Sequence, residues 1–165
     1  MIALLDYQFG PNSRKRLAAS ADPSQEGAVA ALETFYYALN RRDLDTLSAV
    51  WSQDELVQLN NPVGGILRSG SAVTDLYRRI FTGNLFLTVT FVDAATYGWP
   101  EVAVFAGREV GQYHDRTGAT VPITIRTSRV FGYDHAVGRW LQVHHHGSID
   151  DPEQLAGYQR EVRGE

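Results

Sequence analysis

The chain has 165 residues, which suits one domain with a single hydrophobic core. Its net charge is −4, and its basic residues are scattered apart from Arg14 to Arg16, so a nucleic-acid-binding surface is not expected. The absence of cysteine excludes disulfides and thiol catalysis and favours a reducing compartment. No stretch approaches the roughly 18 apolar residues of a membrane span, and no basic region precedes the first apolar run. We therefore expect a soluble, cytoplasmic protein that binds no membrane.

Residues 1–22 are irregular and rich in turn formers, which favours a flexible N-terminal extension. The alternative is that they pack against the domain or a neighbouring subunit. Asp22 is then expected to cap a helix that has Pro23 at its first position. Apolar residues at helical spacing continue to about Asn40 and predict one buried face: Val29, Leu32, Phe35, Tyr36 and Leu39.

Two further helices are expected before the middle of the chain. Asp43 is placed to cap a short helix that ends near Trp51, and Ser69 or Ser71 starts a third helix with Tyr77 on its apolar face. Between them, "ELVQLNNPVGG" reads as a strand interrupted by a proline and two glycines.

From residue 84 onward the hydrophobic period changes to two, which is typical of strands. Short turn sequences separate four long runs and predict an antiparallel meander: Leu85 to Tyr97, Val102 to Tyr113, Val121 to Tyr133, and Trp140 to Ile149. Residues 151–165 read as a polar C-terminal tail or short helix. The predicted fold is α+β, with a strongly curved, mostly antiparallel sheet whose concave side is closed by the three helices around a pocket.

Two segments carry a resemblance to a known superfamily. The run "ALNRRDLDTLSAVW…LVQLNNPVGGILRSGSAVTDLY" and the run "TSRVFGYDHAVGRWLQVHHHGSID" resemble the nuclear transport factor 2-like superfamily over about residues 24–150. This superfamily includes ketosteroid isomerases and SnoaL-like polyketide cyclases, and the second run is also similar to the association domain of calcium/calmodulin-dependent protein kinase type II. The resemblance implies a cone-shaped SnoaL-like domain over residues 23–150. It does not select one chemistry, because members of the superfamily catalyse different reactions or only assemble.

The isomerase mechanism is not expected from the matched positions. Where the ketosteroid isomerases have a carboxylate base, a system that serves as a standard case of pKa tuning, this sequence has Asn61. An amide cannot accept and return a proton near neutral pH, although it can orient a substrate carbonyl. The positions of the two oxyanion partners fall on Phe35 and Thr127. The resemblance therefore argues against steroid isomerisation.

The remaining polar candidates lie on the last two predicted strands. Strand alternation places Thr127 and Arg129 on one face, and the resemblance turns that face into the cone. Alternation likewise separates His144 and His146 from His145, and the resemblance places His144 and His146 inside, near Arg129. Three interpretations of that pair stay open: metal ligands that lack a third partner, an acid/base pair, and a hydrogen-bonded structural cluster. Arg129 either binds an anionic or carbonyl-bearing ligand or forms a structural ion pair.

Three aromatic side chains are further candidates for lining the pocket, with simple packing as the alternative: Tyr36, Trp51 and Tyr77. Three aromatic residues are expected on or beside the convex side of the sheet and agree with the homodimers or larger homo-oligomers that the superfamily implies: Tyr97, Trp99 and Tyr113.

Two functions follow from the sequence. The first is a SnoaL-like pocket protein acting on a cyclic or carbonyl-bearing metabolite as a cofactor-free cyclase, isomerase or dehydratase. In it His144 or His146 is the acid/base, Arg129 stabilises negative charge and Asn61 orients the substrate. No metal and no cofactor are expected. The second is a non-catalytic ligand-binding or oligomerisation module like the kinase association domain.

Overall fold

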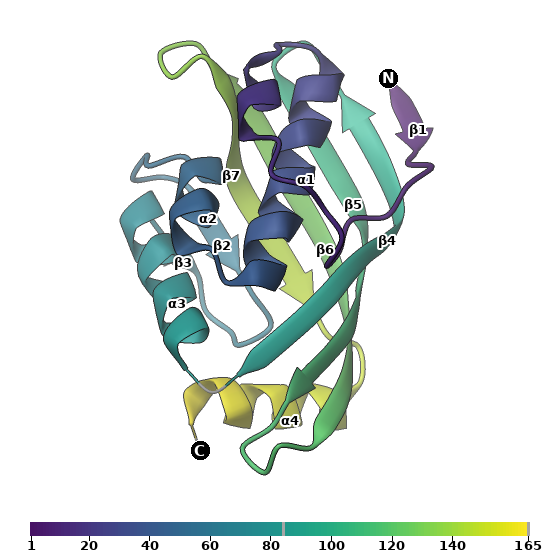
Figure 1. The fold of residues 1–165 in the computed structure, drawn as a ribbon, viewed down its shortest axis with the longest axis vertical. Coiled ribbons are helices and arrows are strands. Elements are labelled where there is room, and N and C mark those ends of the chain that lie inside the picture. The colour runs from purple at the N-terminus through teal and green to yellow at the C-terminus, as the bar shows by residue number, and fades with distance from the viewer. Residues whose placement is uncertain (84, 165) are drawn as a thin grey trace.

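The computed structural model describes residues 1–83 and 85–164, and its helices lie on one side of a single curved sheet (Figure 1). Three helices follow the N-terminal extension: α1 (Gln25–Arg41), α2 (Leu44–Val50) and α3 (Gly70–Thr82). A short 3-10 helix, η1 (Leu17–Ala21), precedes them and α4 (Pro152–Arg163) ends the described chain. Within the described residues, no helix is long and apolar enough to cross a membrane.

The helix starts follow the sequence signals with one correction. The carboxylate of Asp43 accepts a hydrogen bond from Thr46 N, and the Ser69 hydroxyl accepts one from Ala72 N, so both expected caps are confirmed. The N-cap of α1 is Ser24 rather than Asp22. Asp22 instead accepts a hydrogen bond from Ser24 N, which places the first turn of the helix two residues later than predicted.

The sheet has the strand order β1-β4-β5-β6-β7-β2-β3, and only β2 pairs in parallel, with β7. The expected α+β cone with a mostly antiparallel sheet is thereby confirmed. The four predicted long strands are present within one residue at each end: β4 (Phe86–Gly98), β5 (Val102–His114), β6 (Thr120–Asp134) and β7 (Arg139–Ser148). Three short strands complete the sheet: β1 (Ile2–Leu4), β2 (Gln58–Asn60) and β3 (Leu67–Arg68).

The long strands bend sharply where β4 and β5 face each other. A bulge between Val92 and Ala95 interrupts the pairing, and Asp93 within it has a positive φ of 51°. Opposite the bulge, a Cβ atom on Gly107 would lie 2.7 Å from Val92 O, so only glycine fits there. This bend brings the inward side chains of β5 and β6 towards α1.

The N-terminal extension packs on the domain. β1 pairs with β4, and Phe9 forms a further bridge with Phe91. Phe9 is buried and its ring lies parallel to Tyr36 at 6.5 Å between centroids. Arg14 and Arg16 both bind the buried carboxylate of Glu33 in α1. Of the two alternatives for residues 1–22, the structure shows packing against the chain's own domain.

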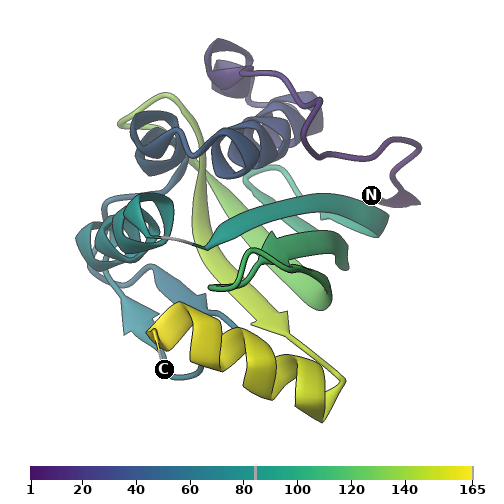
Figure 2. The same ribbon diagram turned by 60° about the horizontal axis from the view of Figure 1, so that its bottom comes forward.

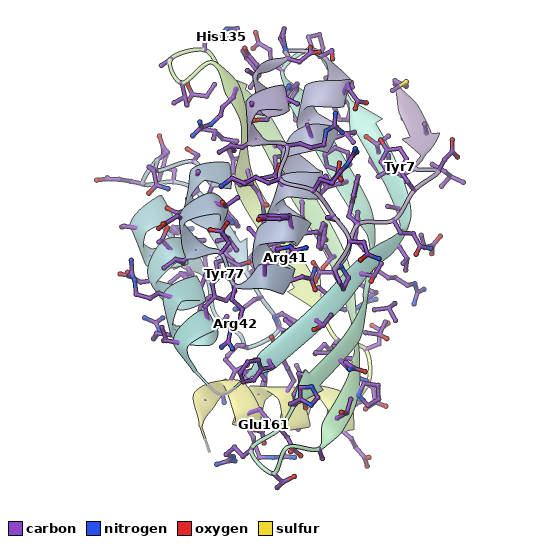
Figure 3. The ribbon with its side chains drawn as sticks, viewed as in Figure 1. Tyr7, Arg41, Arg42, Tyr77, His135 and Glu161 are labelled. Atoms are coloured by element: carbon purple, nitrogen blue, oxygen red, sulfur yellow. The ribbon has the colours of Figure 1, made fainter. Side chains whose placement is uncertain are left out.

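The two ends of the cone differ. His135 marks the β6–β7 hairpin at one end, and Glu161 in α4 marks the other (Figure 3). There α4 lies across the edge of the cone, beside the β5–β6 hairpin (Figure 2). The Glu161 carboxylate accepts a hydrogen bond from Arg116 N in that hairpin at 3.1 Å. Residues 151–163 thus form a capped helix over the mouth of the cone.

Candidate functional site

Three buried polar side chains meet in the centre of the cone. Arg129 projects from β6, Glu109 from β5 and Tyr36 from α1. The Arg129 guanidinium contacts a Glu109 carboxylate oxygen at 2.6 Å and donates to the Tyr36 hydroxyl at 3.1 Å. The same hydroxyl donates to Glu109 at 2.8 Å. Each member of this triangle, which we call the Arg–Glu–Tyr network, therefore bonds to the other two, and this fixes all three rotamers.

Aromatic rings and an amide surround the guanidinium. Arg129 lies over the Phe35 ring at 3.7 Å from the centroid and donates to the Gln142 side-chain oxygen at 3.4 Å. Burial disfavours its charged form, but the Tyr36 phenol and the Glu109 carboxylate outweigh that effect, so the pKa of Arg129 is raised. Arg129 therefore remains a cation, and Glu109 balances its charge within the core.

Tyr77 lies on the side of α3 that faces α1 (Figure 3), with its ring 6.3 Å from Phe35. Burial raises the pKa of Tyr77 to about 12, so its phenol is neutral across the physiological range. Tyr36 is completely buried, and burial also raises its pKa. Both phenols can donate hydrogen bonds, and neither ionises readily.

The expected orientation of the histidines is wrong. His145 is the inward residue, with 5% of its surface exposed, whereas His146 is exposed and His144 is half-buried. Strand β7 contains a bulge: Phe131 pairs with Gln142 and Val130 with His144, so Val143 is left without a partner. Because the extra residue shifts the alternation by one, Trp140 and Gln142 point inward before it and His145 after it.

His145 pairs across the sheet with Arg129 and lies between β6 and β2. Neither of its ring nitrogens has a hydrogen-bond partner among residues 1–83 and 85–164. Burial lowers the pKa of His145 well below its ordinary value, and the positive charge of Arg129 adds to the effect. The imidazole is therefore neutral at physiological pH, with one donor nitrogen and one acceptor nitrogen.

The hydroxyl of Thr127 is a second buried group without a partner in the described part of the chain. Thr127 pairs with Gly147, which has no side chain, and lies diagonally across the strands from His145. Because unpartnered polar groups in a protein interior are uncommon, these two mark the inner face of β6 and β7 as a place where a ligand could complete the hydrogen bonding.

The other predicted site residues lie in different surroundings. Trp51 is buried with its indole nitrogen unpaired within the described residues, and its backbone forms a bridge with Gln142 in β7. Asn61 is half-buried, and its side-chain oxygen accepts a hydrogen bond from Val63 N in the turn after β2. The structure thus brings Tyr36, Tyr77, Thr127 and Arg129 to the interior, while Asn61 serves a turn.

Two members of the site escaped the sequence reading. Glu109 lies on the inward face of β5, in step with Phe105 and with Tyr113, which is buried and not on the convex side as expected. Strand alternation contained that signal, since a carboxylate among inward aromatic residues requires a buried partner. His145 could not be found in this way, because the bulge that turns it inward leaves no pattern in the residue types. Among the described residues, no three His, Cys, Asp or Glu side chains are grouped to hold a metal.

Comparison with known proteins adds family and fold. The family model described as a SnoaL-like domain matches residues 29–152. No curated protein matches the chain.

Solved structures with the same fold include three informative neighbours. A candidate dehydratase of the nuclear transport factor 2-like family from Streptomyces avermitilis is 20% identical, with a TM-score of 0.67, over 76% of this chain and 95% of that one. A nuclear transport factor 2-like superfamily protein from Salmonella enterica is 18% identical, with a TM-score of 0.68, over 77% and 91%. A candidate association domain of calcium/calmodulin-dependent protein kinase type II from Thiobacillus denitrificans is 25% identical, with a TM-score of 0.58, over 74% and 94%.

Proposed function

Because the chain belongs to the SnoaL-like domain family, we propose that it binds a cyclic or carbonyl-bearing small molecule inside its cone and transforms it by cofactor-free acid/base chemistry. The observation that carries this proposal is His145, a buried imidazole with both ring nitrogens unpartnered in the described structure. Leaving such groups unsatisfied costs on the order of 1–3 kcal/mol each, and a ligand hydroxyl or carbonyl would offset that cost.

The proposed roles follow from charge and position. Neutral His145 is the acid/base group, because its free nitrogen can take a proton from a carbon next to a substrate carbonyl. The negative charge that then develops on the carbonyl oxygen is balanced by the imidazolium formed on His145 and is stabilised further by Arg129, which Glu109 and Tyr36 hold in place. The imidazolium returns the proton to the substrate to complete an isomerisation, or to a leaving hydroxyl to complete a dehydration. These roles replace those expected for His144 and His146.

Proton exchange on a simple ketone tests this proposal without knowledge of the natural substrate. We expect the protein to accelerate exchange of the α-protons of 2-tetralone in D2O, measured by NMR, and we expect His145→Gln to abolish the acceleration. The matched control is His146→Gln, which changes the same residue type on the exposed side of the same strand. Equal rates for the two variants, or no acceleration by the wild type, would contradict the acid/base role.

A second candidate function is assembly, and the outer face of the sheet favours it. The helices lie on the concave side (Figure 2), so the convex face is uncovered in the described chain. Its exposed apolar side chains include Ile2 at 73%, Leu4 at 74%, Val102 at 40% and Val110 at 43% exposure. Together with the association-domain neighbour, this face supports a homodimer.

The oligomeric state tests the assembly function. Val104 lies in the middle of this face, between Tyr97 and Val130 on the neighbouring strands. We expect Val104→Asp to convert a dimer to a monomer in size-exclusion chromatography with light scattering. Leu56→Asp is the control, because Leu56 is 82% exposed in the turn before β2. A monomeric wild type would rule out assembly through the convex face.

A further inference from the structure

The helix that covers the mouth of the cone lies beyond the family domain. The SnoaL-like match ends at residue 152, and α4 begins at that residue. The carboxylate of Asp151 caps the helix by accepting from Gln154 N at 2.7 Å. The placement of α4 across the cone edge is visible from two directions (Figures 1 and 2). An element outside the family match thus lies at the opening through which a ligand would reach the interior.

One side chain of α4 reaches the interior. Tyr158 is the only residue buried within the described helix, with 5% of its surface exposed. Its ring meets that of Tyr113, an inward residue of β5, at 5.6 Å between centroids. Burial raises the pKa of Tyr158, and the nearby Glu109 and Tyr77 raise it further. A neutral phenol therefore enters the cone from the mouth and packs beside Tyr113.

Two partly buried apolar side chains, Leu155 and Val162, and polar contacts at the rim hold the rest of α4. Gln159 donates to Pro62 O at 3.0 Å, and Arg163 donates to Val63 O at 3.0 Å. Gln154 accepts from Thr124 N at 3.1 Å. Partly exposed hydrogen bonds of this kind stabilise weakly, so a helix with one fully buried anchor, two partly buried apolar contacts and a polar rim is expected to open more easily than the core.

The interior that Tyr158 approaches has no uncompensated charge. Glu109 neutralises Arg129, and His145 is neutral for the reasons given above. An anionic ligand would meet the Glu109 carboxylate without a free cation, whereas an uncharged hydroxyl or carbonyl would find the unpartnered groups of His145 and Thr127. The sequence left open whether the ligand is anionic or carbonyl-bearing. The pairing of Arg129 with Glu109 favours an uncharged, carbonyl- or hydroxyl-bearing ligand.

We infer that Tyr158 occupies the place of the ligand when α4 is closed, and that the ligand is an uncharged ring compound bearing a hydroxyl or carbonyl group. This inference rests on the proposed function. The buried ring of Tyr158 fills space that a ligand ring would take, so the chain supplies an internal competitor for the ring, while the polar groups of His145 and Thr127 stay unpartnered. The affinity for an added ligand is then reduced by the fraction of molecules in which α4 is closed.

Two probes of equal size but different charge test the inference: 2-naphthol, which is neutral at pH 7, and 2-naphthoate, which is anionic. Binding is measured by fluorescence and by isothermal titration. We expect Tyr158→Ala to bind 2-naphthol about tenfold more tightly than the wild type does, because the competitor is removed. Affinity for 2-naphthoate should stay weaker than that for 2-naphthol in both proteins. Tyr133→Ala is the control, since Tyr133 bonds to Ala21 O beside the other end of the cone.

A second variant keeps the test decisive if Tyr158→Ala fails to fold. The double change Gln159→Ala and Arg163→Ala removes rim contacts without creating a core cavity, and it should also tighten 2-naphthol binding. Hydrogen exchange in α4 should increase in this variant while exchange in β6 does not change. Unchanged 2-naphthol affinity in folded variants, or a preference for 2-naphthoate, would overturn the inference.

The outcomes also separate the inference from the proposed function. If the wild type and Tyr158→Ala bind 2-naphthol equally, and His145→Gln abolishes binding in both backgrounds, the interior binding site is supported and the proposed role of Tyr158 is wrong. If no folded variant binds 2-naphthol and none accelerates 2-tetralone exchange, both the role of Tyr158 and the proposed function are wrong.

Discussion

Two arginines on β6 form ion pairs of similar length in opposite environments. Arg129 points into the cone and contacts Glu109 at 2.6 Å, with side chains 1% and 5% exposed. Arg126 points outward and contacts Asp150 at 2.8 Å, with side chains 59% and 60% exposed. Water competes with the outer pair and is excluded from the inner one, so equal geometry does not imply an equal contribution to stability or chemistry.

The adjacent histidines on β7 repeat this contrast. His146 faces solvent, where water satisfies its ring, whereas His145 faces the interior, where no described residue does. The inner face of β6 and β7 therefore holds two polar groups, on His145 and Thr127, whose hydrogen bonding is incomplete within the described residues. A folded protein tolerates few such groups, which is why the inner face and not the outer one carries the functional proposal.

Breaking the inner pair should have the largest effect. Glu109→Ala leaves the Arg129 cation buried without a counter-charge, and such changes cost about 3–5 kcal/mol of unfolding free energy. We expect urea denaturation to show a loss of that size, or a failure to fold. A loss below about 1 kcal/mol would mean that water reaches Arg129, and the contrast between the two faces would then be wrong.

Removing one hydroxyl from the network should have the next largest effect. Tyr36→Phe keeps the ring but deletes the group that bonds to both Glu109 and Arg129. Hydrogen bonds to charged groups contribute about 1.5–3 kcal/mol, so a loss in that range is expected by urea denaturation. Tyr37→Phe serves as control, because Tyr37 lies under Arg41 rather than beside the network. Equal losses for the two variants would show that the network adds nothing specific.

Most of the fold could be predicted from the sequence because local rules and burial agree. The period-two runs gave the long strands within a residue, and the side chains of Asp43 and Ser69 capped the helices as expected. The N-cap of α1 was predicted at Asp22 and is found at Ser24, because several neighbouring residues near a helix start are suitable N-caps. The packing of residues 1–22 depends on contacts of Phe9 and Glu33 with distant elements, which composition does not encode.

The site was predictable only in part. Arg129 and Thr127 were placed correctly because β6 alternates without interruption on its inner face. His144 and His146 were misplaced because a single bulge at Val143 reverses the phase of the rest of β7. Bulges depend on how a strand bends around the core, and Val143 is a residue type common in regular strands. No local feature of the sequence therefore predicts the bulge at Val143.

The dependence of stability on pH should distinguish His145 from an outer histidine. The unfolded chain protonates His145 near its ordinary pKa of about 6.5, while the folded chain resists protonation because the folded-state pKa is depressed. As pH falls below about 6.5, the unfolded state binds more protons, so this contribution to stability is complete above that pH and is lost below it. We expect a loss of about 1 kcal/mol between pH 7 and 5.5.

The control for this measurement is a histidine substitution on the exposed surface. His145→Gln should reduce the pH dependence between 7 and 5.5, measured by urea denaturation at several pH values, and leave the smaller part due to half-buried His144, whose pKa burial also lowers. His114→Gln should leave the dependence unchanged because His114 is exposed on β5. If His145→Gln retains the full wild-type slope, the imidazole is accessible to water in the folded state, and the site is open rather than closed by α4.

The smallest effect is expected at the outer pair. Asp150→Asn removes the partner of Arg126 but leaves the guanidinium in water, so the change in unfolding free energy should be at most about 0.5–1 kcal/mol and should vanish in high salt. The same measurement bears on assembly, since a second copy seated on the convex face would bury Arg126. A loss of about 2 kcal/mol or more, resistant to salt and dependent on protein concentration, would show that the outer face is covered in solution. Both faces of β6 would then be buried, one inside the domain and one in the dimer interface. The difference between the inner and outer ion pairs would then hold only for the monomer.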